Sequence, residues 1–365
     1  MSRNRYVTGL AAPPGGRRSH WGGFAVPFDK IEKLLVANRG EIAIRVFRAA
    51  TELGIRTVAV YAREDKLSLH RFKADEAYQL PGDGKTAIAA YLDIEQIIAI
   101  ARDAGADAIH PGYGFLSESP DFAEACLAAR IRFIGPEPET MRRLGDKVSA
   151  RAVAIDAGVP VVPASGPLPS DETEIRSIAA GIGYPLMLKA SWGGGGRGMR
   201  PIEDESGLLA SVHSGRSEAK AAFGRDEVYL ERLIRRARHV EVQLLGDTHG
   251  NLYHLFERDC SIQRRNQKVV ERAPAPYLDG KTRADICEAA LKIGGATGYI
   301  GAGTVEFLMD ETSGEFYFIE VNPRIQVEHT VTEMVTGVDI VKAQIRIAEG
   351  GRIGNTAETG VPPQK

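Results

Sequence analysis

Apolar and polar residues between positions 31 and 134 follow a pattern that predicts strands and helices in turn. Four short apolar runs predict strands at Lys33–Ala37, Thr57–Tyr61, Ala106–Ile109 and Arg132–Ile134. Apolar residues at helical spacing predict helices at Glu41–Leu53, Tyr91–Ala104 and near Asp121–Ala129. This alternation predicts a mostly parallel sheet with helices on both faces.

A second pattern, near the end of the chain, predicts a β-hairpin. Two strand-like runs, Thr304–Met309 and Glu315–Val321, flank a polar turn from residue 310 to residue 314. If residue 310 pairs near residue 316, Glu306 lies almost opposite Glu320. Facing carboxylates on neighbouring strands repel each other, so this register predicts a cation between them.

Polar residues continue at every second position after this hairpin. They are Glu320, Asn322, Arg324, Gln326 and Glu328. An extended chain points such residues to one face, and this mixture of carboxylate, amide and guanidinium suits a cation next to an anion. The alternative is the solvated face of an edge strand, and Pro323 does indicate a loop or an edge.

A glycine-rich segment follows the strand predicted at Tyr184–Trp192. Five of the six residues from 193 to 198 are glycines, and Lys189 and Arg197 flank or interrupt them. Glycines let backbone amides approach an anion closely. In a P-loop the lysine follows the glycines, whereas Lys189 precedes them on a strand. We therefore predict a phosphate-binding hairpin flap, with a flexible linker as the alternative.

Three further segments suggest binding residues. The apolar run at 228–234 leads to Glu231, and nucleotide bases often lie in crevices beside such strands. His239, Glu241 and Gln243 alternate with apolar residues and share one face. The segment Arg258–Lys268 is strongly basic, and binding strip and solvated loop are equally good interpretations of it.

Composition limits the class of protein. A chain of 365 residues suggests two or three domains, and 43% hydrophobic with 26% charged residues is typical of a soluble globular protein. Forty-six basic against 48 acidic residues indicate neither a nucleic-acid nor a membrane partner. Three scattered cysteines fit neither a disulfide framework nor a zinc site, and no apolar run is long enough to span a bilayer.

The first 28 residues differ from the rest. They contain several arginines but no acidic residue before Asp29, and Pro13–Gly16 forbids regular structure. Such a leader is either a mitochondrial transit peptide or a disordered bacterial extension. The expected location is accordingly the cytoplasm of a bacterium, or the mitochondrial matrix if the leader is a transit peptide.

Six segments together resemble the biotin carboxylase domain of the ATP-grasp superfamily, most closely that domain in the pyruvate carboxylase family. They are KLLVANRGEIAIRVFRA, HPGYGFLSE, LGDKVSAR, MLKASWGGGGRGMR, ERDCSIQRRNQKVVE and FIEVNPRIQVEHTVTE. The segment EDKLSLHRFKADEAYQ and Trp192 favour pyruvate carboxylases over acyl-CoA carboxylases. The resemblance extends from residue 30 to the end of the chain.

The resemblance implies an α/β fold, an ATP-grasp fold preceded by a Rossmann-like parallel-sheet domain. The expected divisions are a leader at 1–29, the N-terminal biotin carboxylase domain at 30–145, the flap domain at 146–233, and an incomplete catalytic domain at 234–365.

The resemblance also implies roles for individual residues. Glu306, Glu320 and Asn322 would hold Mg²⁺ or Mn²⁺, and Lys268, Arg324, Gln326 and Val327 would bind bicarbonate. Glu328 would act as general base, with Arg324 and Lys268 as further catalytic residues. The nucleotide would be bound by Lys147, Lys189, Gly194, Gly195, Gly196, Met199, Glu231, Arg232, His239, Gln263 and Asn266.

The implied reaction is the first half-reaction of pyruvate carboxylase. Glu328 would deprotonate bicarbonate, which attacks the γ-phosphate of ATP to give carboxyphosphate, while Arg324 and the metal stabilise the transferring group. Carboxyphosphate would then release CO₂ to carboxylate the N1′ atom of biotin. Arg232 replaces a usual lysine and Asn266 replaces a histidine found in many members, so the nucleotide contacts are expected to differ in detail.

The resemblance implies partners as well. No Met-Lys-Met biotinylation motif is present, and the family's last subdomain would lie beyond Lys365. The expectation is therefore a truncated domain that meets biotin on a carrier domain and works with a carboxyltransferase domain, both absent from this chain, in a homo-oligomeric full enzyme. The alternatives are the biotin carboxylase of an acyl-CoA carboxylase, another ATP-grasp ligase, or an incomplete fragment that only binds nucleotide.

Overall fold

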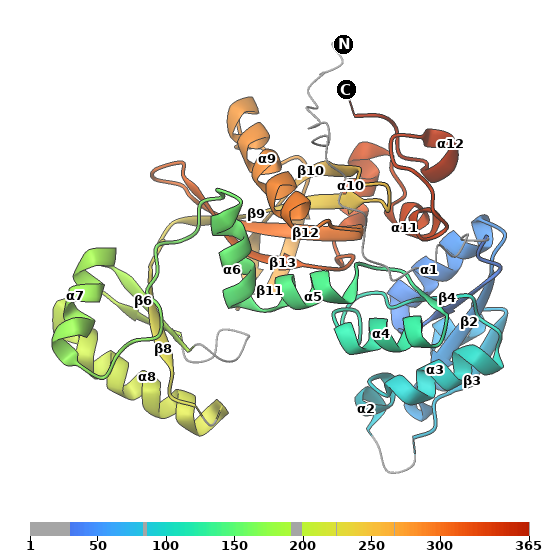
Figure 1. Cartoon of the computed structure of the whole chain (residues 1–365), viewed down its shortest axis with the longest axis horizontal. Coiled ribbons are helices and arrows are strands. Elements are labelled where there is room, and N and C mark those ends of the chain that lie inside the picture. Colours follow the sequence, from blue (N-terminus) through green and yellow to red (C-terminus); the bar gives the residue numbers. More distant parts are fainter. Residues whose placement is uncertain (1–29, 83–85, 191–198, 224, 266, 365) are drawn as a thin grey trace.

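Three sheets organise the protein in this computed structural model, which describes residues 30–82, 86–190, 199–223, 225–265 and 267–364. In Figure 1 a three-stranded sheet lies at the left, a five-stranded antiparallel sheet in the middle and a five-stranded parallel sheet at the right. Within the described ranges, no helix is long and apolar enough to cross a membrane.

The parallel sheet has the strand order β3-β2-β1-β4-β5. Its strands are β1 (Lys33–Val36), β2 (Arg56–Tyr61), β3 (Glu76–Gln79), β4 (Ala108–His110) and β5 (Arg132–Phe133). Leu34 and Val36 pack in a core with helix α1 (Gly40–Glu52), whereas Leu35 packs on the opposite face with helices α3 (Ile94–Asp103) and α4 (Pro120–Ala128). Burial on both faces explains the continuous apolar runs and confirms the predicted parallel sheet.

The helix predicted at Tyr91–Ala104 corresponds to α3, but a second, short helix that ends at Tyr91 was missed. The structure has two helices there, α2 (Ala87–Tyr91) and α3 (Ile94–Asp103). Asp93 stands between them, and its side chain accepts a hydrogen bond from the backbone N–H of Gln96. An aspartate in this N-cap position starts a new helix, which the apolar spacing did not reveal.

The three-stranded sheet has the order β7-β6-β8 and is covered by helices α7 (Glu172–Ile182) and α8 (Leu208–Phe223). Its strands are β6 (Leu186–Ala190), β7 (Arg200–Ile202) and β8 (Val228–Arg232). Strands β6 and β7 pair antiparallel, with Leu186 opposite Ile202. The glycine-rich segment connects these two strands, as predicted for a hairpin, but residues 191–198 lie outside the described ranges.

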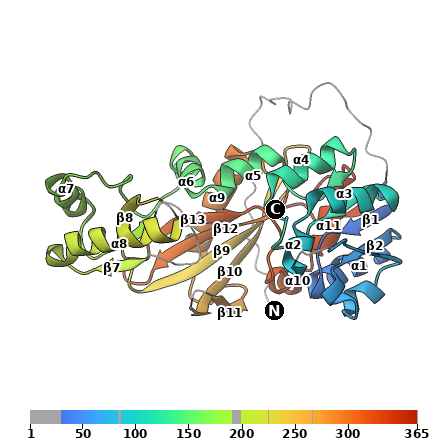
Figure 2. The same cartoon turned by 90° about the horizontal axis from the view of Figure 1, so that it is seen from below.

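The five-stranded antiparallel sheet has the order β11-β10-β9-β12-β13. Its strands are β9 (Ala237–Gly246), β10 (Leu252–Arg264), β11 (Gln267–Arg272), β12 (Gly301–Asp310) and β13 (Phe316–Asn322). Three helices cover one face (Figure 2), namely α5 (Pro138–Gly145), α6 (Lys147–Asp156) and α9 (Gly280–Ala296). Val242 and Phe307 point into this core, so the alternating neighbours Glu241 and Glu306 line the opposite face.

The remaining short elements complete the described chain. They are α4 (Pro120–Ala128), α10 (His329–Thr336), α11 (Ile340–Ala348), α12 (Thr356–Thr359) and the 3₁₀ turns Arg63–Asp65, Leu69–Phe72 and Glu205–Gly207. Helix α11 packs with α1, so the end of the described chain returns to the parallel sheet.

A buried histidine joins the parallel sheet to α11. His110 Nδ1 accepts the backbone N–H of Gly112 at 3.0 Å, and Nε2 lies 3.3 Å from Gln344 Oε1. Burial lowers the pKa of His110 to about 4, so the folded protein holds the ring neutral.

Acid is therefore expected to destabilise the fold through His110. Below pH 6.5, the ordinary pKa of histidine, His110 is protonated in the unfolded chain but stays neutral in the folded chain. The free energy of unfolding therefore falls between pH 6.5 and pH 4, by roughly 3 kcal/mol in all. Unfolding midpoints measured over this pH range should fall less steeply for His110→Gln than for the unmodified protein. Equal slopes would contradict this assignment.

Candidate active site

The face of the antiparallel sheet that is not covered by α5, α6 and α9 carries the predicted carboxylate pair. Glu306 on β12 lies opposite Glu320 on β13, as predicted, and the register shifts at the next position. Strand β13 is the edge of the sheet, as Pro323 indicated. Glu306 also lies opposite Glu241 on β9, so three glutamates share one row across three strands.

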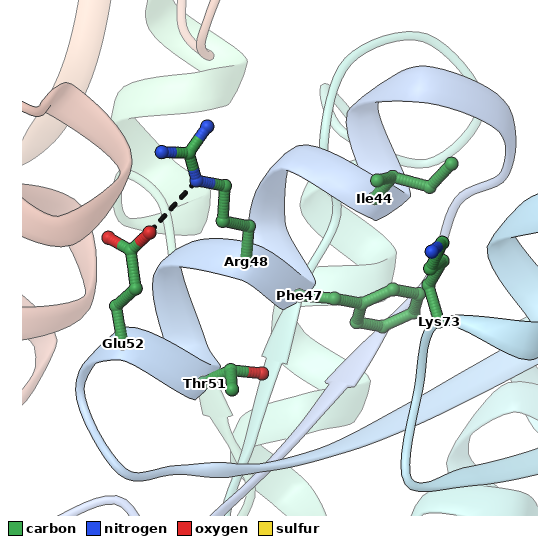
Figure 3. A pocket seen from close by; sticks show the side chains of 6 residues that line it. All are labelled: Ile44, Phe47, Arg48, Thr51, Glu52 and Lys73. Carbon is green, nitrogen blue, oxygen red and sulfur yellow. Dashed lines mark hydrogen bonds and ion pairs between the residues drawn. The ribbon is translucent and has the colours of Figure 1, made fainter.

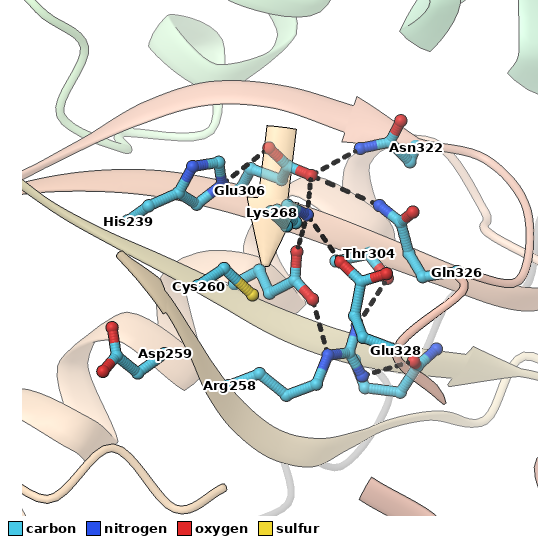
Figure 4. A network of polar contacts seen from close by, with 12 residues as sticks. His239, Arg258, Asp259, Cys260, Lys268, Thr304, Glu306, Asn322, Gln326 and Glu328 are labelled. Atoms are coloured by element: carbon cyan, nitrogen blue, oxygen red, sulfur yellow. Dashed lines mark hydrogen bonds and ion pairs between the residues drawn. The ribbon is translucent and has the colours of Figure 1, made fainter. Parts of the chain in front are cut away.

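Glu306 is the centre of a polar network (Figure 4). Its Oε1 accepts hydrogen bonds from Lys268 Nζ at 2.8 Å, Asn322 Nδ2 at 2.9 Å and Gln326 Nε2 at 3.2 Å. Its Oε2 lies 2.7 Å from His239 Nε2. Burial would raise the pKa of Glu306, but the His239 contact and the Lys268 charge outweigh burial and lower it.

Glu320 behaves in the opposite way. Burial, and then the negative charge of Glu306, raise the pKa of Glu320, while Lys147 Nζ at 3.7 Å partly offsets the rise. A divalent cation between these two carboxylates would favour the charged form of both. Together with the amide oxygen of Asn322, they form the oxygen donor set that Mg²⁺ prefers, so the residues fit a magnesium site.

The polar row that starts on β13 continues into a loop, as Pro323 indicated. The strand ends at Asn322, and Glu328 directly precedes helix α10. The loop between them still gathers the row, because Arg324 Nη1 donates to Gln326 Oε1 at 2.7 Å and Nη2 donates to Asn322 Oδ1 at 3.1 Å. The side chain of Val327, by contrast, is 57% exposed.

Lys268 on β11 joins the predicted base to the predicted metal carboxylate. Its Nζ donates to Glu328 Oε1 at 2.7 Å and to Glu241 Oε2 at 2.5 Å, in addition to Glu306. Burial and the negative charge of Glu241 raise the pKa of Glu328, and the nearby Lys268 charge only partly offsets the rise. A raised pKa makes Glu328 a better proton acceptor than an ordinary carboxylate.

Sequence reasoning gave no role to the ion pair beneath this network. Arg258 and Glu241 are both fully buried, and Arg258 Nε donates to Glu241 Oε1 at 2.5 Å. The other guanidinium nitrogens donate to Gln243, Thr304 and Thr332. The period-two pattern from His239 to Gln243 was the available signal for Glu241. The segment Arg258–Lys268 contributes to strands β10 and β11, and Arg258 and Lys268 pair with Glu241, whereas Arg264 and Arg265 are exposed to solvent.

A second missed residue comes from the parallel-sheet part of the chain. Glu118 follows the His110–Gly114 turn, and its Oε1 accepts a hydrogen bond from Arg324 Nε at 2.5 Å. Only its place in the HPGYGFLSE segment could have drawn attention to it.

The predicted nucleotide residues fall into two groups. On the three-stranded sheet, Lys189 forms an ion pair with Glu231. On the antiparallel sheet, Gln263 Nε2 lies 2.9 Å from His239 Nδ1. Arg232 and Met199 are exposed, and Gly194, Gly195, Gly196 and Asn266 lie outside the described residues.

The structure also has a pocket away from the polar network around Glu306. It lies on the outer face of α1, has a volume of about 290 Å³ and contains none of the predicted site residues (Figure 3). Its lining residues are Ile44, Phe47, Arg48, Thr51, Glu52 and Lys73.

Two protein-family models match this chain, one over its parallel-sheet part and the other over the two antiparallel sheets. Residues 30–141 match the family model of the biotin carboxylase N-terminal domain. Residues 146–356 match the family model of the carbamoyl-phosphate synthase L chain ATP-binding domain. The structure of the biotin carboxylase–βγ-ATP complex from Campylobacter jejuni is 48% identical, with a TM-score of 0.82, and the match covers 90% of this chain and 73% of that one. The chain belongs to the biotin carboxylase family.

Two other matches describe its relatives within the biotin carboxylase family. Pyruvate carboxylase from Bacillus subtilis is 57% identical over 92% of this chain, but the match spans only 29% of that protein. The biotin carboxylase domain dimer of Hydrogenobacter thermophilus 2-oxoglutarate carboxylase, in complex with MgADP, ADP and bicarbonate, is 50% identical, with a TM-score of 0.81, over 90% of this chain and 71% of that one. The predicted fold, an ATP-grasp fold preceded by a parallel-sheet domain, is confirmed.

Proposed function

We propose that this chain carboxylates biotin at the expense of ATP and bicarbonate, as the first half-reaction of a pyruvate carboxylase. One observation carries the proposal: a single ammonium group, Lys268 Nζ, bonds both the candidate base Glu328 and the candidate metal carboxylate Glu306. A base, an anion-binding cation and a metal ligand are thus within one hydrogen-bonded network, which is what deprotonation of bicarbonate beside a metal-bound triphosphate requires.

The proposed reaction begins with bicarbonate held by Lys268, Arg324 and Gln326, together with the backbone N–H of Val327. Glu328 takes the bicarbonate proton, and an oxygen of the resulting dianion attacks the γ-phosphorus of ATP. The new O–P bond forms as the bond to the β-phosphate oxygen breaks, which gives ADP and carboxyphosphate. Arg324 and Lys268 stabilise the charge spread over the transferring group.

We propose that the remaining site residues bind the nucleotide and its cation. Lys147 and Lys189, with the glycine segment 194–196, would contact phosphates, and Glu231 and Arg232 would contact the base. Met199, His239, Gln263 and Asn266 would line the pocket. When bound between Glu306, Glu320 and Asn322, Mg²⁺ or Mn²⁺ would supply charge neutralisation at the phosphates.

The carboxyl acceptor is proposed to be biotin on a carrier domain. Carboxyphosphate would break down to CO₂ and phosphate, the released phosphate would take the proton of the biotin N1′ atom, and N1′ would attack the CO₂. Identity of 57% to a pyruvate carboxylase supports pyruvate as the final acceptor, delivered by a separate carboxyltransferase domain.

One assay tests the proposal. The purified protein is incubated with ATP and Mg²⁺, with and without bicarbonate and with and without free biotin, and ADP release is measured. ATP cleavage that requires bicarbonate and Mg²⁺, and that rises with biotin, is the expected result. Cleavage that ignores bicarbonate would contradict the proposal, and nucleotide binding without turnover would favour a fragment that only binds nucleotide.

A further inference from the structure

Glu306 Oε1 accepts hydrogen bonds from two of the donors that the proposed function assigns to bicarbonate, Lys268 and Gln326. Lys268 Nζ, Gln326 Nε2 and Asn322 Nδ2 all donate to this single oxygen (Figure 4). A carboxylate oxygen has two lone pairs. A divalent cation on Glu306 Oε1 therefore cannot coexist with all three donors.

Lys268 in this arrangement has no N–H left for an anion. An ammonium group has three donors and no acceptor, and here they go to Glu241, Glu306 and Glu328 at 2.5, 2.8 and 2.7 Å. The Gln326 side chain is equally engaged, since its nitrogen donates to Glu306 while its oxygen accepts from Arg324. Bicarbonate can gain a bond from either residue only if a carboxylate gives one up.

Among the three carboxylates around Lys268, Glu306 is the one that can be released. Glu241 is fully buried and held by Arg258, so it keeps its position. Glu328 must stay next to the anion whose proton it accepts. Glu306 alone gains a replacement partner during the proposed reaction, namely the divalent cation that it would share with Glu320.

We propose that Glu306 is a latch that couples cation binding to bicarbonate binding. A divalent cation that binds Glu306 displaces Lys268 and Gln326, and both donors then turn to bicarbonate. The latch rests on the proposed function, because that function supplies the cation and the anion. It requires positive coupling: each ligand must tighten the binding of the other by the same factor, typically about 5- to 150-fold.

Calorimetric titration of the unmodified protein tests this coupling without turnover. Bicarbonate is titrated with and without Mg²⁺, and Mg²⁺ with and without bicarbonate, in the absence of nucleotide. Both affinities should rise by the same factor, of at least about fivefold. Equal bicarbonate affinity with and without Mg²⁺ would overturn the latch.

A pair of variants separates the latch from a general effect of charge. Glu306→Leu and Glu320→Leu each remove one negative charge and its acceptor oxygens from the same carboxylate pair, but only Glu306 bonds Lys268 and Gln326, whereas the ion pair of Glu320 is with Lys147. In the absence of Mg²⁺, Glu306→Leu is expected to bind bicarbonate at least about fivefold more tightly than Glu320→Leu does. Equal affinities in the two variants, or weaker binding by Glu306→Leu, would overturn the latch.

Failure of the latch and failure of the proposed function give different results. Bicarbonate-dependent ATP cleavage without Mg²⁺–bicarbonate coupling would refute the latch alone. Absence of bicarbonate-dependent cleavage in the unmodified protein would refute the proposed function. Circular dichroism of each variant identifies a folding defect, and the titrations of the unmodified protein decide the question without any variant.

Discussion

Glu328→Gln is expected to lower bicarbonate-dependent ATP cleavage by about 10²- to 10⁴-fold, the usual contribution of a general base. The amide has nearly the same shape as the carboxylate but cannot accept the bicarbonate proton. It can still accept a hydrogen bond from Lys268, which now bonds Glu328 Oε1 at 2.7 Å. The loss should therefore appear in kcat, and calorimetry should show nearly unchanged ATP binding.

The matched control for this substitution is Glu315→Gln. Glu315 is an exposed glutamate in the β12–β13 hairpin. Its side chain accepts a hydrogen bond from the Tyr317 hydroxyl and takes no part in the network around Glu306. Its rate should equal that of the unmodified protein. A loss of less than about tenfold in Glu328→Gln would show that another group takes the proton.

Arg258→Met is expected to produce the largest loss of stability. The substitution keeps much of the side-chain volume but leaves Glu241, which is fully buried, with Lys268 as its only cationic partner among the described residues. Removing one member of a buried ion pair usually costs about 3–5 kcal/mol. For a chain of 365 residues that corresponds to a fall of roughly 4–7 °C in the midpoint of thermal unfolding.

Two further variants test the cause of that loss. Arg264→Met changes an exposed arginine on the same strand and should change stability by less than about 0.5 kcal/mol. Adding Glu241→Gln to Arg258→Met removes the uncompensated buried charge and should recover part of the loss. An unfolding midpoint for Arg258→Met within about 2 °C of the unmodified protein would contradict the importance of this pair.

The sequence predicted features that depend on short stretches of chain. The register that sets Glu306 opposite Glu320 follows from a hairpin whose two strands are joined by a short turn, so local pairing fixed it. The parallel sheet followed from alternating strands and helices. The helix predicted at Tyr91–Ala104 matches α3, but the short helix α2 and the start of α3 at its N-cap Asp93 were missed, because apolar spacing does not report an N-cap.

The candidate site was only half predictable, because its residues lie on separated segments. Arg258 looked like part of a solvated basic strip, yet four side chains from β9, β12 and α10 surround its guanidinium. Glu118 lies 206 residues before its partner Arg324. The alternation of polar and apolar residues along a single strand cannot predict such contacts, since they form only when the sheets and the loop at 110–118 pack together.

What the sequence determined by itself is therefore the set of chemical groups and their local faces: the glutamate pair, the polar row after it, and the lysine that precedes the glycine segment. The tertiary structure decided which of these groups form hydrogen bonds and ion pairs with one another. Lys268 meets Glu241, Glu306 and Glu328 only because β11, β9, β12 and the start of α10 converge. Burial within that convergence raises the pKa of Glu320 and Glu328, whereas the His239 contact and the Lys268 charge outweigh burial and lower the pKa of Glu306, because a carboxylate's charge depends on the neighbours that replace its water.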